Sequence, residues 1–343
     1  MKMQHCVNTK WGKSLTMRAM SNLSKKVFPL CQHLDALVDE LRGRVPGALD
    51  KFDEDAIHKA RVATRRLKAA LALLSTVLNE EHSRPFARLG RRLRRRLGPM
   101  RDIDVMLSHL DEIKPTSPLT PAVEWLRQRL IEAREDARKE SAQKAPPTQV
   151  LSRLGSWWAL RQDVIDADPA VESLLVESLH AQLDQFIQRA GEMGPGSDPH
   201  ELRIAGKALR YTLELAKAEG HNLPAMVLRT FKRMQECLGT WHDYVVLAER
   251  AMQASIDEDL PLHHPALQRL VLKLVDHAMR KAQRELDRFA KLWAEHGAKL
   301  AKTIREEFSE KEVAIAPQTG PDPSGSTIPP APEDASTDPP PAA

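Results

Sequence analysis

The chain has few aromatic residues and few cysteines. Tyr, Trp and Phe together make up 4% of its 343 residues, and its three cysteines, Cys6, Cys31 and Cys237, lie far apart. An odd number of scattered cysteines provides no disulfide framework and predicts a reducing, cytoplasmic location. The low aromatic content leaves few rings on which nucleic-acid bases could stack, which disfavours a protein that binds single strands.

Long hydrophobic runs and strand-like alternation are also missing. No run of 18 or more uncharged apolar residues occurs, so we expect no membrane-spanning helix. The first twenty residues lack the apolar segment of a secretory signal, and we expect no such signal. No stretch alternates strictly between apolar and polar residues. Leu and Ala dominate the apolar positions, which is typical of helical proteins.

Almost every segment between residues 28 and 308 has helical periodicity, with breaks at Gly and Pro. The blocks LGPMRD (97–102) and LGTWHD (238–243) begin 141 residues apart (238 minus 97). The sequence therefore predicts an all-α fold of two pseudo-symmetric four-helix bundles that arise from an internal repeat. The expected helix pairs are 28–43 with 169–190, 54–79 with 198–219, 83–113 with 223–255, and 119–144 with 262–308.

Composition divides the chain into three regions. Residues 1–25 form a basic arm and residues 312–343 a proline-rich tail, and we expect both to be disordered. Between them we expect one folded domain. Asp198, with Pro199 and Glu201 after it, predicts an N-cap with a capping box. The expected domain covers residues 26–311, with a first half at 26–147, a connecting segment at 148–165 and a second half at 166–311.

Positive charge is concentrated in one part of the chain. Residues 58–101 contain 13 Lys or Arg against two acids, a net charge of +11, whereas the whole chain carries only +4. The remaining residues therefore sum to −7. Because local fields decide what a surface attracts, this segment predicts an anion-binding surface.

The stretches HKARVATRRLK and HELRIAGKALR, which begin at His58 and His200, share one pattern. On a helix with about 100° per residue, the histidine of each stretch and the basic residues three, seven and ten positions after it fall within an arc of about 80°, opposite an apolar face. No acid occurs between residues 57 and 79, although a solvated helix normally mixes charges because like charges repel. The pattern therefore favours an external anion over a plain solvated face. The two basic faces consist of His58, Arg61, Arg65 and Lys68, and of His200, Arg203, Lys207 and Arg210.

A further basic face is expected in the helix that begins near residue 83. At the positions that correspond to Arg88, Arg91 and Arg95, the second half has Arg229, Lys232 and Glu236. Because an acid replaces an arginine there, we expect the first half to bind anions more strongly. The arginines at four-, three- and four-residue spacing on this face are Arg84, Arg88, Arg91 and Arg95.

In this order the blocks resemble the CHAD family, the conserved-histidine α-helical domain. The resemblance rests on HKARVATRRLKAAL, LG-x-x-RDIDV, HELRIAGKALRYTLE and a second LG-x-x-x-D, and it covers residues 28–308. It implies two bundles whose basic faces line a central groove or channel that binds inorganic polyphosphate. With Arg88 and Arg229 added from the same helix faces, the residues expected to bind polyphosphate are His58, Arg61, Arg65, Lys68, Arg88, Arg91, Arg95, His200, Arg203, Lys207, Arg210, Arg229 and Lys232.

The chemistry of these residues suits such a ligand. A phosphate chain is best held by many charge-assisted hydrogen bonds, and guanidinium groups match phosphate oxygens well. A histidine among them either stays neutral and donates one N–H or becomes protonated when the polyanion binds. We favour coupled protonation, because arginines lower a histidine pKa and a bound anion raises it. Since Arg61 and Arg65 lie off the apolar face, reversing both to Glu is expected to abolish binding and preserve helix content.

Three carboxylates and two glycines near the LG blocks have two interpretations. Asp102, Asp104 and Asp243 could hold a metal ion, but we favour a role in orienting arginines or capping helices. Gly98 and Gly239 are expected to allow close helix approach.

We therefore expect a non-catalytic polyphosphate-binding protein without a cofactor, located in the cytoplasm at polyphosphate granules. One alternative is binding to the backbone of RNA or DNA, with nucleic acid as a secondary partner. A second is a metal-dependent polyphosphatase or triphosphatase, which would need a carboxylate cluster that the sequence does not clearly offer. The sequence does not indicate an oligomeric state.

Overall fold

The computed structural model describes residues 28–194 and 198–309, and all regular structure within these ranges is helical. The prediction of an all-α fold is thus confirmed, whereas the predicted disordered arm and tail lie outside the described residues. The elements are α2 (Pro29–Pro46), a π-helical turn η1 (Gly47–Lys51), α3 (Glu54–Leu73), α4 (Glu80–Asp111), α5 (Thr120–Ala142), α6 (Pro147–Leu154), α7 (Trp157–Asp166), α8 (Asp168–Gly191), α9 (Pro199–Ala218), α10 (Ala225–Asp257), α11 (Leu260–His263) and α12 (Pro265–Ser309).

The helices that carry the two repeated motifs begin at side-chain caps. The Asp53 carboxylate accepts a hydrogen bond from the Ala56 amide at the start of α3, over 2.8 Å. The Asp198 carboxylate accepts one from the His200 amide at the start of α9, over 2.9 Å, which confirms the predicted N-cap. Each cap satisfies a backbone N–H that the helix itself leaves unpaired. Both motifs therefore lie on helices whose N-termini are capped by an aspartate side chain.

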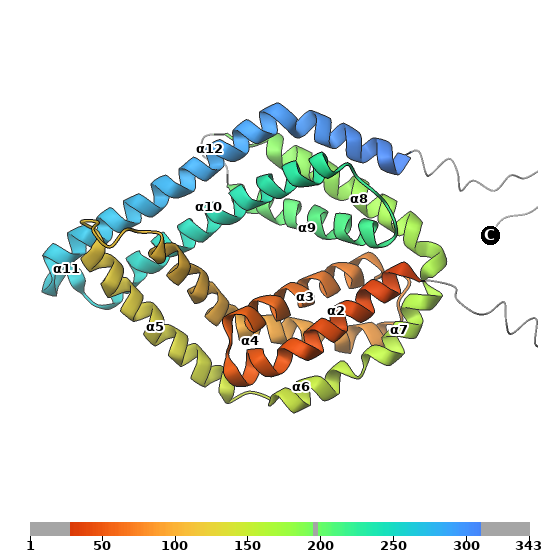
Figure 1. Ribbon diagram of the computed structural model, residues 1–343, viewed down its shortest axis with the longest axis horizontal. Helices are drawn as coiled ribbons and strands as arrows, with labels where there is room; N and C mark the ends of the chain where they lie inside the picture. The colour runs from red at the N-terminus through yellow and green to blue at the C-terminus, as the bar shows by residue number, and fades with distance from the viewer. Residues whose placement is uncertain (1–27, 195–197, 310–343) are drawn as a thin grey trace, which may run out of the picture.

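The helices form a ring-like arrangement around a central region (Figure 1). Helices α2, α3 and the first half of α4 lie on one side of it, α8, α9, α10 and α12 lie on the other, and the second half of α4 runs toward α10. Helix α5 joins the two sides at one end, and α6 and α7 join them at the other. Helices α3 and α9, which carry the basic motifs, face each other across the centre and contact one another.

Each of the two hydrophobic cores contains residues from both halves of the sequence. One core combines α2, α3 and the first half of α4 with α6 to α9, the first half of α10 and the second half of α12. The other combines α5, α11 and the remaining halves of α4, α10 and α12. The two sides are thus held together by shared cores. Helix order follows the expected pairs, but α12 has 45 residues and α5 only 23, and the two bundles from an internal repeat stay a prediction.

The expected connecting segment consists mainly of the two short helices α6 and α7. The buried Trp157 ring contacts Phe86 of α4 at a centroid distance of 5.6 Å. The Trp157 indole N–H donates to the Asp35 carboxylate of α2 over 2.8 Å. These contacts fasten the connection to the first half. In the part of the chain that the structure describes, no helix is long and apolar enough to pass through a bilayer.

Candidate anion-binding groove

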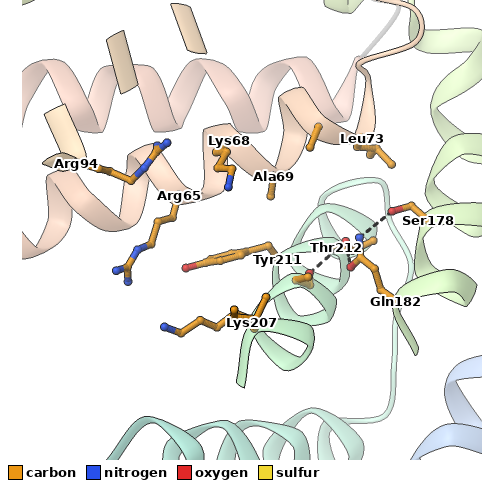
Figure 2. Close-up of a pocket in the computed structure, with 13 residues that line it drawn as sticks. Arg65, Lys68, Ala69, Leu73, Arg94, Ser178, Gln182, Lys207, Tyr211 and Thr212 are labelled. Atoms are coloured by element: carbon orange, nitrogen blue, oxygen red, sulfur yellow. Dashed lines mark hydrogen bonds between the residues drawn. The ribbon is translucent and has the colours of Figure 1, made fainter. Parts of the chain in front are cut away.

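Basic side chains from both sides of the ring line one groove between α3 and α9. The cavity has a volume of about 560 Å³. Arg65 and Lys68 extend into it from α3, Lys207 from α9 and Arg94 from α4 (Figure 2). No Asp or Glu is among the described residues that line it. The groove therefore concentrates positive charge from three helices that are distant in sequence.

The rest of the groove wall is uncharged. Small and apolar side chains of α3 and α9 form part of it, and the Tyr211 ring lies beside them (Figure 2). At the end near α8, the Thr212 hydroxyl donates to the Gln182 side-chain carbonyl over 2.6 Å, and the Gln182 amide donates to the Ser178 hydroxyl over 2.9 Å. This hydrogen-bonded row closes one end of the groove. The apolar residues of the wall are Ala69, Ala72, Leu73, Ile204 and Ala208.

The crowding of cations changes the protonation of Lys207. Burial and the neighbouring guanidinium groups of Arg203 and Arg65 lower the pKa of Lys207 to about 7. The free protein therefore holds this amine only partly charged at neutral pH. A bound anion would replace the lost hydration and restore the proton.

Arg203 lies next to Lys207 and is also poorly neutralised. Burial lowers the pKa of Arg203, the Asp243 carboxylate opposes this effect, and Arg65 adds to it. Its Nε is buried and has no hydrogen-bond partner among the described residues. Arg203 is not among the described residues that line the groove, so this buried Nε offers no accessible donor to a ligand there. Arg65 of α3 influences both Arg203 and Lys207, so the two motif helices share one electrostatic environment.

The two motif histidines stand exposed at the starts of their helices. Partial desolvation by the surrounding protein, followed by Arg101, Arg65 and Arg61, lowers the pKa of His58 against the opposing effect of Asp55. The lowered pKa makes the His58 imidazole of the free protein harder to protonate than an isolated histidine, and the coupled-protonation hypothesis stays a prediction. His200 stacks on His242 of α10 at a centroid distance of 6.2 Å.

Arg61 is not an open, ligand-facing residue. Its side chain is buried, and Nη1 donates to the backbone carbonyl of Arg94 over 2.8 Å. Nη2 lies 3.6 Å from the Asp102 carboxylate. Arg61 thus joins α3 to α4. The expected preservation of helix content after its reversal to Glu rested on Arg61 lying off the core, and that premise is wrong because Arg61 is buried, where a carboxylate would lie near Asp102.

The structure brings Arg91 near the groove but separates it from Arg88 and Arg95. Arg91 lines a neighbouring cavity of about 240 Å³ that shares Lys68 and Arg94 with the groove. Arg88 and Arg95 line two other cavities, between α4 and α6. The three arginines therefore do not act on one common space.

Two arginines of α4 that the sequence interpretation left out stand on its groove side. Arg94 donates to the backbone carbonyl of Thr64 over 2.7 Å while it lines the groove. Arg101 lies beside His58 and pairs with Glu54 over 3.0 Å. Around a helix, Arg94 lies about 60° from Arg91, on the side opposite to Arg88. The spacing of three residues from Arg91 to Arg94 and of seven from Arg94 to Arg101 was the available signal in the sequence.

Of the basic residues predicted for the second half, Lys207 alone is among the described residues that line the groove. Arg210 pairs with Glu214 at 3.6 Å, and Lys232 pairs with Glu236 at 3.6 Å. Both line another cavity of about 550 Å³. Arg229 is exposed on α10. The acids Glu214 and Glu236 reduce the positive charge here, and the weaker anion binding of the second half stays a prediction.

The aspartates near the LG blocks contact arginines and histidines. Asp104 is buried and pairs with Arg134 of α5 over 2.6 Å. Burial raises the pKa of Asp243, but His109 and His242 outweigh it and hold this pKa below its usual range. Asp102, although exposed, lies near Arg61. Within residues 28–194 and 198–309, no group of three or more His, Cys, Asp or Glu side chains is arranged to hold a metal ion.

Comparison with known proteins identifies the family. The CHAD domain family matches residues 32–252, well over half of the chain. The crystal structure of the CHAD domain from the plant Ricinus communis is similar in fold, with 20% sequence identity, a TM-score of 0.52, and coverage of 74% of this chain and 90% of that chain. PptA from Streptomyces chartreusis has 16% identity and a TM-score of 0.48, and the alignment covers 76% of this chain and 99% of that chain. Among curated protein sequences, none matches. The chain belongs to the CHAD domain family.

Proposed function

We propose that this protein binds inorganic polyphosphate in the groove between α3 and α9 without cleaving it. The observation that carries the proposal is the convergence of Arg65, Lys68, Arg94 and Lys207 on one cavity whose described lining contains no acid. A linear polyanion can contact both sides of the ring at once, because it presents phosphate oxygens along its whole length. Guanidinium and ammonium donors would hold these oxygens by charge-assisted hydrogen bonds.

The carboxylates near the groove support binding over hydrolysis. Cleavage of a phosphoanhydride needs carboxylates for divalent metal ions or a base that activates a nucleophile. Asp102 and Asp104 contact Arg61 and Arg134, and Asp243 contacts His109 and His242. These contacts leave the groove with cations that bind phosphate and without a carboxylate that directs a metal to it.

The groove favours polyphosphate over nucleic acid. Tyr211 is the one aromatic side chain among its described lining residues, so successive bases would find no row of stacking partners. A competition experiment separates the two ligands. We expect long-chain polyphosphate to displace labelled polyphosphate at a much lower phosphate concentration than tRNA or duplex DNA. Equal displacement by nucleic acid would favour the alternative.

The direct test is a titration with labelled polyphosphate. The variant Arg65→Glu with Lys68→Glu should lose about tenfold or more in affinity for each charge removed, because charge-assisted hydrogen bonds contribute about 1.5–3 kcal/mol each. The matched control is Arg269→Glu with Lys273→Glu on α12, where both side chains are exposed and outside the groove. Equal binding by the two variants would contradict the proposal, and so would Mg²⁺-dependent phosphate release from tripolyphosphate by the wild-type protein.

A cellular role follows from the same binding. We propose that the protein resides in the cytoplasm and associates with polyphosphate granules through the groove. A fluorescent fusion should collect on granules in cells that contain them, and the Arg65→Glu, Lys68→Glu fusion should stay diffuse. Granule association of the variant would contradict this role.

A further inference from the structure

Helix α4 carries a second row of arginines on its outer side. Arg88, Arg92 and Arg95 follow one another at four- and three-residue spacing, and Arg153 of α6 lies across from them. Two cavities of about 370 and 340 Å³ occupy this seam and share Leu89, Arg92 and Arg153. We call this surface the outer trough. Its other lining residues are Pro85, Leu93, Arg96, Lys144, Ala145, Val150, Ser152 and Ser156.

The four arginines of the outer trough are exposed and not neutralised. None of Arg88, Arg92, Arg95 and Arg153 forms an ion pair with another residue in the described ranges, and no Asp or Glu is among the described residues that line the two cavities. Like charges at these spacings repel by a few tenths of a kcal/mol per pair. By contrast, the exposed Arg280 of α12 is neutralised within one turn by Asp276. Unbalanced charge of this kind is typical of a surface that meets an anion.

A further cavity lies between the groove and the outer trough and shares lining residues with both. Lys68 and Arg94 line both the groove and the 240 Å³ cavity that contains Arg91. Leu89 lines that cavity and both cavities of the outer trough. Arg91 and Arg92 are consecutive residues of α4. Arg91 lines the 240 Å³ cavity, and Arg92 lines both cavities of the outer trough. Basic residues thus continue around a single helix, which is about 10 Å across.

We propose that the outer trough binds a second segment of the polyphosphate chain whose first segment lies in the groove. The inference rests on the proposed function and adds a separate site with its own ligand segment. No aromatic ring is among the described residues that line the trough, which disfavours stacked bases. Arginine forks and the hydroxyls of Ser152 and Ser156 are donors that phosphate oxygens accept.

Such an arrangement makes affinity depend on chain length. Once a long chain occupies the groove, its free part stays near the trough at a high effective concentration, and the second contact forms without a second encounter. A ligand as short as tripolyphosphate can occupy the groove but cannot reach around α4. Long chains should therefore bind more tightly per molecule, with a steeper dependence on salt.

The test compares long-chain polyphosphate with tripolyphosphate on the variant Arg92→Gln with Arg153→Gln. We expect the affinity for the long chain to fall about tenfold or more, and its salt dependence to weaken by a slope of about 1–2. The affinity for tripolyphosphate should stay unchanged. The control Arg269→Gln with Lys273→Gln should match the wild-type protein for both ligands, and circular dichroism should show equal helix content for all proteins.

Each other outcome has a definite meaning. If Arg92→Gln with Arg153→Gln binds long-chain polyphosphate as tightly as the wild-type protein does, the outer trough is not a second binding site. Equal losses for both ligands would also overturn the second site, because they would indicate a long-range field in place of a second contact. A loss of RNA binding alone would assign the trough to nucleic acid. If the wild-type protein does not bind tripolyphosphate, or if Arg65→Glu with Lys68→Glu leaves that binding unchanged, the groove proposal fails independently of the trough.

Discussion

Arg66 of α3 and Glu214 of α9 form an ion pair across the two sides of the ring, with 2.7 Å between Nε and Oε2. The Glu214 carboxylate also lies 3.6 Å from Arg210. One acid thus neutralises an arginine from each motif helix. The pair holds α3 and α9 together beside the groove and limits repulsion between their basic faces.

The first prediction concerns this acid. Glu214→Gln should destabilise the protein by about 1–2 kcal/mol at low ionic strength, because two partly buried guanidinium groups lose their common partner. Added salt should recover part of the loss by screening the remaining charges. Thermal unfolding at low and high salt measures both effects. The comparison variant Asp276→Asn removes the exposed pair with Arg280 and should change stability very little. An equal loss of stability in the two variants would show that the Arg66–Glu214 pair stabilises the protein no more than an exposed ion pair does.

The second prediction separates two neighbouring arginines of one motif. Arg61→Glu should destabilise the protein by about 2–4 kcal/mol, because the buried guanidinium loses its bond to the Arg94 carbonyl and a carboxylate takes its place near Asp102. Arg65→Glu should change stability by less than about 0.5 kcal/mol while it weakens polyphosphate binding. Urea unfolding gives the stabilities. Similar stability of both variants would contradict the structural role of Arg61.

The third prediction follows the charge of Lys207. Its pKa is about 7 in the folded protein, against about 10.4 in an unfolded chain, so the unfolded state binds more protons between these values. The contribution of Lys207 to stability is therefore unfavourable below pH 7 and improves as pH rises from 7 to about 10. Lys207→Met should raise the melting temperature by about 2 °C or more at pH 6 and remove this trend.

The same residue should make polyphosphate binding depend on pH. Because a bound anion raises the pKa of Lys207, binding takes up a proton, and wild-type affinity should fall as pH rises above 7, by at most about tenfold per pH unit. Titrations at pH 6.5 and 8.5 measure the change. Lys207→Met should show a flatter profile over this interval. If the affinity of Lys207→Met depends on pH as strongly as that of the wild-type protein, a group other than Lys207 takes up the proton.

The fourth prediction distinguishes the two glycines of the LG blocks. A Cβ at Gly98 would lie 3.0 Å from Arg61 Nη1, whereas a Cβ at Gly239 would meet nothing within 4 Å. The expected close approach is confirmed at Gly98 and wrong at Gly239. Gly239→Ala should stabilise α10 by about 0.5–1 kcal/mol, since alanine favours helix. Gly98→Ala should bring no gain or should destabilise by about 1 kcal/mol, because Arg61 must move. An increase in stability for both Gly98→Ala and Gly239→Ala would contradict this distinction.

The sequence was sufficient for the helical fold and for the α3 and α9 parts of the groove. Strong periodicity and repeated motifs placed Arg65, Lys68 and Lys207 on the side opposite the apolar face, where the structure has them. Helix α4 was harder to interpret, because arginines occur on several sides of it. A helical projection could not decide between the face of Arg91 and Arg94 and the face of Arg88 and Arg95. That choice depends on how α6 and α3 pack against α4.

The burial of Arg61 could not be predicted from the sequence either. In projection it belongs with Arg65, and only the close approach of α3 to α4 at Gly98 brings its guanidinium to the Arg94 carbonyl. Likewise, Arg210 shares the basic arc of Lys207, but its pairing with Glu214 holds it in a different cavity. Contacts between helices, and not the pattern along one helix, decide which cations are free for a ligand.

The central claim is that α3 and α9 contact one and the same anion, and calorimetric titration with tripolyphosphate at about pH 6, where Lys207 is charged, tests it most directly. The wild-type protein should bind one tripolyphosphate per chain, and Arg65→Met and Lys207→Met should each weaken that single event by about tenfold. Two independent binding events in the wild-type protein, of which each variant loses one, would show separate sites on the two helices and would contradict the claim.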